Sequence, residues 1–279
     1  MDPVTIGQVE LRGVRDAAAA RKAVARHRRA WMRLLDGHIP SMVQRGGGVR
    51  GIEVRTVGKG RLVLHLLVDT RDAMGANVTN TLCEALAPVA AEALGARAGL
   101  RILSNLADHR LATAACTVPA AALGGREAVA AIVAANRFAL EDPYRAATHN
   151  KGILNGIDPV LIATGNDWRA VEAGAHAYAA RTGAYRALTT YRKNKADDLE
   201  ASLTLPMAVG TVGGVTRLHP TARACLRLLG EPDARRLAAV CASVGLAQNL
   251  AALKALAGEG IQRGHMALHA SNLALARRA

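Results

Sequence analysis

Two cationic side chains and several other hydrogen-bond donors lie close together between Asp142 and Asp158. The segment supplies two charged groups, two amides and one hydroxyl, namely Arg145, Thr148, Asn150, Lys151 and Asn155. Such groups donate hydrogen bonds to a carboxylate, or to an oxygen on which negative charge develops during a reaction. Because two glycines interrupt the segment, we expect a loop that binds a carboxylate or a developing oxyanion. A solvated polar loop without a ligand is the alternative that these residues leave open.

An acidic residue, Asp167, follows sixteen residues after Lys151, where a helical pattern begins. A carboxylate beside an ammonium group would keep the lysine charged and oriented, or would change its proton affinity. Aspartate is also a common helix N-cap, because its side chain accepts hydrogen bonds from the first free amides of the helix. Both interpretations of Asp167 remain open from the residues alone.

Two histidines, His265 and His269, are spaced four residues apart and would share one face of a helix. That spacing is typical of zinc helices, but no glutamate follows His265 and no third ligand is indicated, so we expect no metal. One of these histidines acting as a general acid is a second hypothesis, and an ordinary surface or core histidine is a third. The glycine-rich segment 210–216 lacks the Gly-Lys-Ser/Thr ending of a phosphate loop.

The elements that would position these groups fall into two parts. In the first part, a half-buried strand at residues 9–14 precedes a helix at 20–35, and a hairpin of strands at 52–55 and 61–69 precedes a helix at 78–93 and a strand at 100–106. This β-α-β-β-α-β order is that of ferredoxin-like domains. We therefore predict an α+β protein whose small domain spans residues 1–112.

The second part, residues 113–279, has the composition of a mainly helical domain. Alanine-rich helices are predicted at 127–140, 167–181, 222–229, 231–244, 246–257 and 260–276. Alternation at Leu203 and Leu205 indicates one short strand, and the glycine-rich residues 207–215 are expected to be extended or turning.

Composition excludes several classes of protein. The 279 residues are 51% hydrophobic, so the chain is not disordered, and the net charge of +14 indicates attraction to anions. Four dispersed cysteines indicate a reducing compartment, and no long apolar run or signal peptide is present, so we expect a cytoplasmic, soluble protein. A basic nucleic-acid-binding module is a remote alternative, since aromatic residues make up only 3% of the chain.

Six stretches together resemble 3-hydroxy-3-methylglutaryl-coenzyme A (HMG-CoA) reductase in its soluble bacterial form. They occur in the family's order, at residues 72–77, 102–108, 142–152, 163–174, 244–249 and 259–269. The resemblance implies an oxidoreductase that converts HMG-CoA to mevalonate and coenzyme A with NADH or NADPH, or runs the reverse reaction. It also implies a homodimer or higher homo-oligomer, with no nucleic-acid or membrane partner.

The same resemblance implies roles for individual residues. The small domain would bind the cofactor through Asp72, Met74, Gly75, Asn77 and Asn105. Asp16, at the junction of the first strand and its helix, would bond the adenosine ribose 2′-hydroxyl and favour NADH over NADPH.

In the large domain, Lys151 would stabilise the oxyanion, Asp167 would orient Lys151, and His265 would protonate the coenzyme A thiolate. The carboxylate and hydroxyl of the substrate would be bound by four further residues, which are Arg145, Thr148, Asn155 and Gln248.

Two features depart from the family pattern. Family members carry a Glu-Asn-Val-Ile-Gly motif with a catalytic glutamate before the small domain, and this sequence contains no such motif. The helical tail after His265 is also short. We therefore expect a truncated form of a working enzyme. The alternative is an inactive paralogue that binds cofactor and oligomerises.

Overall fold

The structure, a computed structural model, describes residues 2–258 and 260. The chain divides into two compact units. The first comprises Met1–Ala112, Leu161–Tyr178 and Pro206–Ala238, and the second comprises Thr113–Val160, Ala179–Leu205 and Ala239–Ala279. The first segment of the first unit ends at Ala112. The grouping of two later segments with the first unit was not predicted, because local periodicity does not report which distant segments pack together.

The first unit is built on a four-stranded antiparallel sheet with the strand order β2-β3-β1-β4. Its elements follow the predicted β-α-β-β-α-β order, with one additional short helix, α2. They are β1 (Val4–Arg12), α1 (Ala17–Gly37), α2 (Pro40–Gln44), β2 (Gly48–Thr56), β3 (Arg61–Asp69), α3 (Ala76–Ala93) and β4 (Arg97–Ser104). Strand β1 pairs with β3 from Val4↔Asp69 to Arg12↔Arg61, so the start of β1 and the end of β3 lie at the same end of the sheet.

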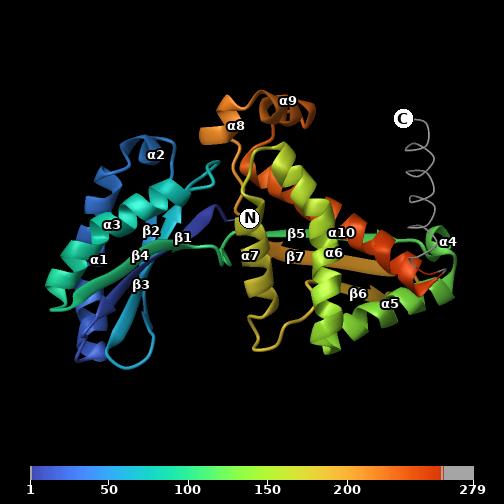
Figure 1. Ribbon diagram of the computed structural model, residues 1–279, viewed down its shortest axis with the longest axis horizontal. Helices are drawn as coiled ribbons and strands as arrows, with labels where there is room; N and C mark the ends of the chain where they lie inside the picture. The colour runs from blue at the N-terminus through green and yellow to red at the C-terminus, as the bar shows by residue number, and fades with distance from the viewer. Residues whose placement is uncertain (1, 259, 261–279) are drawn as a thin grey trace, which may run out of the picture. The chain divides into compact units, whose positions relative to one another are not determined.

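Helices α1 and α3 pack on this sheet and form the core of the first unit with it (Figure 1). In the second half of β1, Val9 and Leu11 are fully buried and their neighbours Gln8 and Glu10 are half-buried, as the period of two predicts, whereas the first four residues of the strand are all buried. Helix α1 buries Ala20, Val24, Trp31 and Leu35, which are the positions that the helical pattern selected. Gly7 permits a close approach of α3, because a Cβ atom at this position would collide with the Cys83 sulfur.

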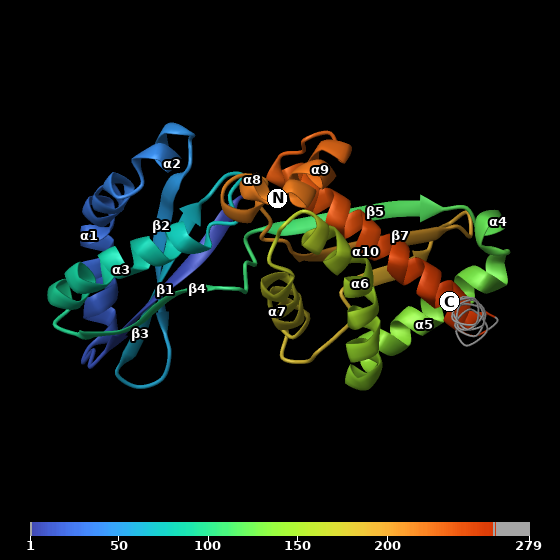
Figure 2. The ribbon, with the colours of Figure 1, turned by 45° about the horizontal axis from the view of Figure 1, so that its top comes forward.

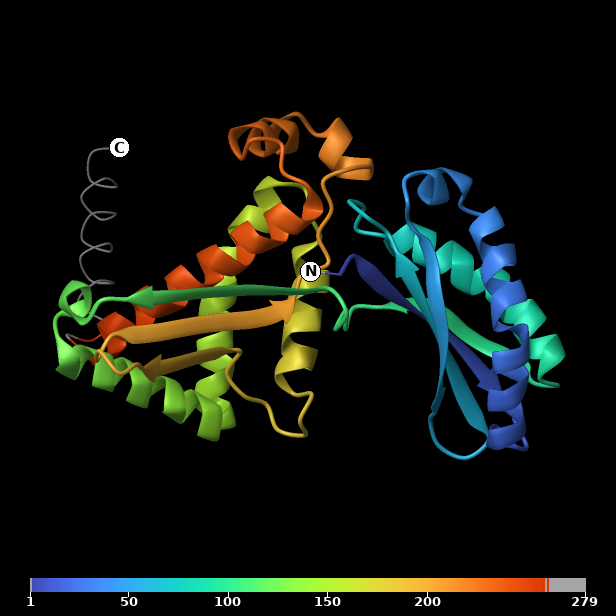
Figure 3. The same cartoon turned by 180° about the vertical axis from the view of Figure 1, so that it is seen from behind.

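The second unit contains a three-stranded sheet, whereas the sequence analysis expected one short strand among its helices. The strands are β5 (Leu111–Val118), β6 (Thr189–Lys193) and β7 (Leu199–Pro206), in the order β5-β7-β6. Helices α6 (Pro143–Ala163) and α10 (Ala234–Ala257) lie on one side of these strands (Figure 3). Strand β5 is rich in alanine and threonine and half of it is exposed, so it lacks the apolar alternation that would have identified it.

The segment expected to be a loop, Asp142 to Asp158, is instead helical from Pro143 onward and forms most of α6. The two helices expected at 231–244 and 246–257 form the single helix α10. The glycines serve helix packing. A Cβ atom at Gly156 would lie 2.8 Å from the Gln248 Cβ, and one at Gly245 would lie 2.8 Å from the Ile157 Cδ1. Small residues here let α6 and α10 pack closely where they cross (Figure 2).

The remaining helices are α4 (Ala120–Leu123), α5 (Arg126–Glu141), α7 (Trp168–Ala179), α8 (Gly214–Leu218) and α9 (Pro220–Leu228). In the part of the chain that the structure describes, α10 alone is long and apolar enough to span a membrane by composition. Close to half of the apolar stretch of this helix is buried within the protein. Core helices of soluble proteins pass the same test, so this observation is weak evidence for a membrane span.

Candidate functional site

Helix α6 presents one polar face to the surface. Thr148, Lys151 and Asn155 are exposed, and their spacing of three and four residues places them on the same side of the helix. The opposite side is buried and includes Ala146, Ile153, Leu154, Ile157 and Leu161. The structure therefore brings together three groups that the sequence singled out, although a helix rather than a loop holds them.

Two more predicted substrate-binding residues belong to the surroundings of this face. Gln248 on α10 is exposed, and its Cβ lies against Gly156, the residue next to Asn155. Arg145, about one turn before Thr148 and nearly two turns before Lys151, is half-buried. The second unit thus carries a surface with two cations, two amides and a hydroxyl, a donor set suited to a carboxylate or an oxyanion.

The rotation of α6 is fixed by buried polar residues that the sequence analysis did not assign to this purpose. The Asn150 amide donates to the Arg186 carbonyl at 2.9 Å and accepts from the Leu188 amide at 3.0 Å. His149 Nε2 lies 2.6 Å from the Thr189 hydroxyl, which itself donates to Asn136 at 2.9 Å. These bonds hold the inner face of α6 in one orientation, and so determine where Lys151 points.

The hydrogen bonds also define the tautomer of His149. The Thr189 hydroxyl uses its hydrogen toward Asn136, so His149 Nε2 is the donor in its bond to Thr189. Nδ1 then carries no proton, and among the described residues it has no partner. Burial, aided by the charge of Arg145, lowers the pKa of His149 to about 4. The ring is neutral at physiological pH.

In the first unit, the predicted cofactor residues form the connection between β3 and α3. Gly75 has a left-handed backbone with φ of 92°, and a Cβ atom there would lie 2.5 Å from the Thr70 side chain, so only glycine fits. The Asp72 carboxylate accepts a hydrogen bond from the Ala234 amide at 2.9 Å. Helix α3 begins directly after Gly75 without a side-chain cap. Its first amides and the exposed Asn77 are therefore disposed to hold an anion.

Asn105 lies at the same end of the sheet as this loop. It follows β4, whose Leu103 amide donates to the Asn80 side chain of α3 at 2.9 Å. Asn105 is exposed, and its carbonyl oxygen lies 2.5 Å from where a Cβ atom of Gly174 would be, which explains the glycine. The first unit therefore places Met74, Gly75, Asn77 and Asn105 at one edge.

Asp16 lies at the other end of the sheet from these residues, so the structure does not group it with them. It follows the end of β1 at Arg12, whereas the loop follows the end of β3 at Asp69, and the register of nine residue pairs separates these ends by roughly 26 Å. The Asp16 carboxylate caps α1 by accepting from the Ala18 and Ala19 amides at 2.8 and 3.0 Å. These bonds lower the pKa of Asp16. Its position at the strand–helix junction reflects capping.

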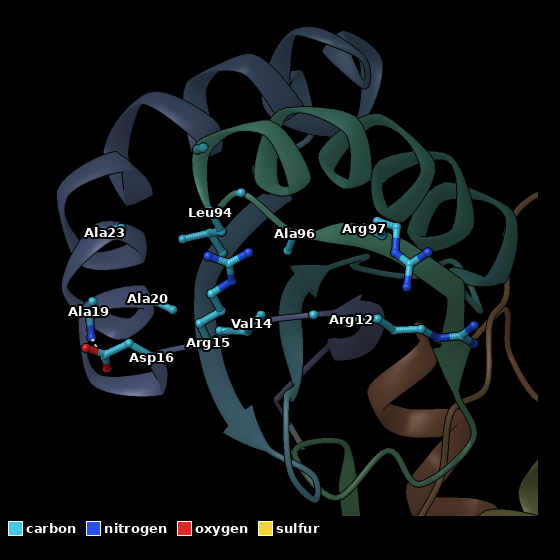
Figure 4. Close-up of a pocket in the computed structure, with 13 residues that line it drawn as sticks. Arg12, Val14, Arg15, Asp16, Ala19, Ala20, Ala23, Leu94, Ala96 and Arg97 are labelled. Atoms are coloured by element: carbon cyan, nitrogen blue, oxygen red, sulfur yellow. Dashed lines mark hydrogen bonds between the residues drawn. The ribbon is translucent and has the colours of Figure 1, made fainter.

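Asp16 also lines a cavity of about 650 Å³ between the starts of α1 and β4. Three arginines, Arg12, Arg15 and Arg97, contribute to the lining, but their guanidinium groups do not converge (Figure 4). Arg12 is paired with Glu10 at 2.7 Å, and Arg15 extends toward Leu94 instead. The cavity shows no arrangement that would hold a phosphate at one point.

Asp167 has the capping geometry that was its alternative interpretation. Its carboxylate accepts from the Ala170 amide at 3.1 Å, in the first turn of α7, and it is exposed. Asp167 belongs to the first unit and Lys151 to the second, so their pairing stays a prediction. The neighbouring Asn166 is buried and accepts from the Gly210 amide at 2.7 Å. No sequence pattern indicated this role, since Asn166 and Asp167 are adjacent polar residues of similar shape.

The histidines His265 and His269 lie outside the described residues. Within residues 2–258 and 260, no cluster of three potential metal ligands is found.

Comparison with known proteins decides the family. Residues 1–270 match the family described as hydroxymethylglutaryl-coenzyme A reductase. The chain belongs to this family. It is 48% identical over 274 residues to the 3-hydroxy-3-methylglutaryl-coenzyme A reductase of Archaeoglobus fulgidus, covering 97% of this chain and 62% of that protein. A probable HMG-CoA reductase of Borreliella burgdorferi is 35% identical over 241 residues, which cover 84% of this chain and 56% of that protein.

Solved HMG-CoA reductases share the fold. The class II enzyme from Streptococcus pneumoniae, bound to NADPH in open conformations, is 47% identical with a TM-score of 0.89, over 91% of this chain and 71% of that one. A second structure of the reductase from this organism matches 99% of this chain and 68% of that one with a TM-score of 0.90. The chain thus spans about three fifths of the length of the curated relatives that it matches.

Proposed function

We propose that this chain carries the cofactor-binding and substrate-binding parts of an enzyme that reduces HMG-CoA to mevalonate and coenzyme A. The balanced reaction consumes two NAD(P)H and two protons and releases two NAD(P)⁺. Membership of the HMG-CoA reductase family supports the reaction. The observation that carries the proposal at the level of residues is the outer face of α6, where Lys151 is exposed between Thr148 and Asn155.

On this face Lys151 would act on the thioester. Its ammonium group would stabilise the negative charge that develops on the carbonyl oxygen as the carbon is reduced. Arg145, with Thr148, Asn155 and Gln248, would bind the carboxylate and hydroxyl of the hydroxymethylglutaryl group. A rigid helix suits this task, because groups that stabilise a transition state must be in place before charge develops.

The residues around Gly75 would bind the nicotinamide cofactor, which supplies hydride when bound. The fit rests on the uncapped start of α3, the close backbone at Gly75 and the exposed amides of Asn77 and Asn105. We assign this loop to the ferredoxin-like small domain that the element order predicts. NADH and NADPH both remain candidates, since Asp16 lies at the other end of the sheet; the S. pneumoniae relative was solved with NADPH.

The other roles implied by the family are part of the same proposal. Asp167 would orient Lys151 and His265 would protonate the coenzyme A thiolate. A homodimer or higher homo-oligomer and a cytoplasmic location complete it. The inactive-paralogue alternative shares the cofactor site but lacks turnover, so binding and activity must be measured separately.

The test is oxidation of NAD(P)H by the purified chain, with and without HMG-CoA, together with calorimetric titration of each ligand. We expect HMG-CoA-dependent oxidation, and we expect Lys151→Ala to reduce it by about a hundredfold or more, the usual cost of losing one group aimed at a developing oxyanion. Lys195→Ala, which removes an exposed lysine from the β6–β7 turn, is the matched control. Binding of both ligands without turnover is the result expected of the inactive paralogue and also of a chain that lacks the glutamate motif, whereas binding of neither ligand would refute the proposal.

A further inference from the structure

Arg110 is a charged side chain in an unusual place. It is fully buried, and it is the largest side chain of the described residues to be so. Burial lowers the pKa of Arg110 to about 10, while the through-space charges of Asp72 and Asp69 oppose the shift. The guanidinium group therefore stays charged at neutral pH. A buried charge is costly unless hydrogen bonds replace its hydration, so its partners indicate what it is for.

Its partners are almost all in the loop before α3. Arg110 donates to the Thr70 hydroxyl at 2.9 Å, to the Ala73 carbonyl at 3.0 Å and, with longer bonds, to the carbonyls of Arg71 and Met74. A further bond, at 2.5 Å, reaches the Val209 carbonyl. All five acceptors are uncharged oxygens, so the guanidinium group fixes the path of the backbone at residues 70–74.

The loop needs such support because its conformation is unfavourable by itself. Arg71 has φ of 50°, in the left-handed region that non-glycine residues seldom adopt, and Gly75 follows with φ of 92°. The segment around Val209 presses on the same loop from the other side. A Cβ atom at Gly210 would lie 2.5 Å from the Met74 nitrogen, and the Asp72 carbonyl accepts from the Thr211 amide at 2.8 Å.

We propose that Arg110 is a positioning residue for the nicotinamide cofactor. Its buried guanidinium group turns the carbonyls of residues 71, 73 and 74 inward, and thereby presents Gly75, Asn77 and the uncapped start of α3 to the ligand. The inference rests on the proposed function, because it presupposes that the cofactor binds at this loop. It assigns no contact between Arg110 and the cofactor.

The experiment measures cofactor and substrate affinity separately. The full chain and the variants Arg110→Lys, Arg110→Met and Thr70→Val are titrated with NADPH, NADH and HMG-CoA by calorimetry, and each is checked by circular dichroism and thermal melting. Thr70→Val removes one acceptor of Arg110 and keeps the shape of the side chain. Thr5→Val is its matched control, since Thr5 is equally buried in this unit and bonds to Val68 and Thr79 instead.

Thr70→Val removes the bond from Arg110 and the bond that the hydroxyl donates to the Ala73 carbonyl at 3.1 Å. At roughly 1 kcal/mol for a buried hydrogen bond, we expect cofactor binding to weaken by about fivefold or more while HMG-CoA binding is unchanged. Arg110→Lys should weaken it by about tenfold or more, and Arg110→Met should weaken it further, so that lysine partly rescues. Thr5→Val should lower the melting temperature without changing cofactor affinity.

If folded Arg110→Lys and Thr70→Val both bind the cofactor as tightly as the unaltered chain does, the inference is overturned and the proposed function is left intact. A parallel loss of cofactor and HMG-CoA binding would also overturn it, because it would show general damage to the fold. If neither Arg110 variant folds, the comparison of cofactor affinity between Thr70→Val and Thr5→Val decides whether the inference holds. Failure of the unaltered chain to bind either nicotinamide cofactor would refute the cofactor site itself, and the inference with it.

Discussion

The buried His149 should make the stability of the second unit depend on pH in a way that one substitution can isolate. The pKa of this histidine falls from 6.5 to about 4 on folding, because burial disfavours the charged ring and the Arg145 charge adds to the effect. A lowered pKa means that the unfolded chain binds the proton more tightly. The contribution of His149 to the free energy of unfolding is therefore complete above pH 6.5 and is lost as the pH falls from 6.5 through about 4.

The size of this loss of stability follows from the difference between the pKa of His149 in the unfolded chain and its pKa in the folded protein. Between about pH 7 and about pH 5 the folded ring stays neutral while the unfolded ring becomes charged, which removes roughly 2 kcal/mol of stability, and full separation is worth about 3 kcal/mol. This is a sizeable part of the net stability of an ordinary domain. Replacing His149 with glutamine removes the titrating ring. The variant should therefore be less stable than the unaltered chain at about pH 7, but its free energy of unfolding should fall less on acidification.

The assay is urea denaturation followed by circular dichroism at several pH values between about 7 and 5, applied to the unaltered chain and to His149→Gln. Acid effects from carboxylates and from the other histidines occur in both proteins and cancel in the difference. His38→Gln, at an exposed histidine of the first unit, controls for the loss of one histidine. Parallel loss of stability in the unaltered chain and in His149→Gln would refute the assignment of a buried neutral ring.

Two further predictions test helix packing and capping. Gly156→Ala should destabilise the chain by about 1–3 kcal/mol, because the new methyl group would lie 2.8 Å from the Gln248 Cβ and 3.1 Å from the Val244 carbonyl. Gly152→Ala, in the same helix with open space around it, should instead be neutral or stabilising by up to about 1 kcal/mol, and urea midpoints that rank these two variants the other way would contradict the packing. Asp16→Ala should lower the melting temperature through loss of the α1 cap yet leave NADH and NADPH affinities unchanged, and calorimetry showing weakened NADH binding would instead support the ribose role of Asp16.

The sequence was sufficient to locate helices and strands whose buried face is apolar. Helix α1 and strand β3 were located because leucine, valine and tryptophan recur at the helix or strand period and are the residues that the core buries. Helix α6 was missed for the opposite reason. Its inner face includes the buried polar residues His149 and Asn150, and glycine occurs at 152 and 156, so the pattern was typical of a polar loop.

Site residues were recognisable by type, but their grouping depended on tertiary register. Asp16 lies at a strand–helix junction, as expected, yet the antiparallel pairing of β1 with β3 places that junction at the far end of the sheet from Gly75. Arg110 gave no signal, since the residues before it, Asp108 and His109, are polar and exposed and suggest a surface turn. Only long-range packing with residues 70–74 and 209 identifies its role.

The two parts of the candidate machinery share one physical principle. In each, an outward-facing segment is held by an inward-facing polar group that is incompletely bonded. Among the described residues, Arg110 Nε and His149 Nδ1 are buried without partners, and native structures hold few such atoms because each costs free energy. Leucine or methionine would fill the same volume without that cost, but neither could fix carbonyls or a hydroxyl in place. The two unbonded atoms therefore belong to polar groups that orient another part of the protein. Arg110 orients the loop before α3 in the first unit, and His149 orients the Lys151 face of α6 in the second.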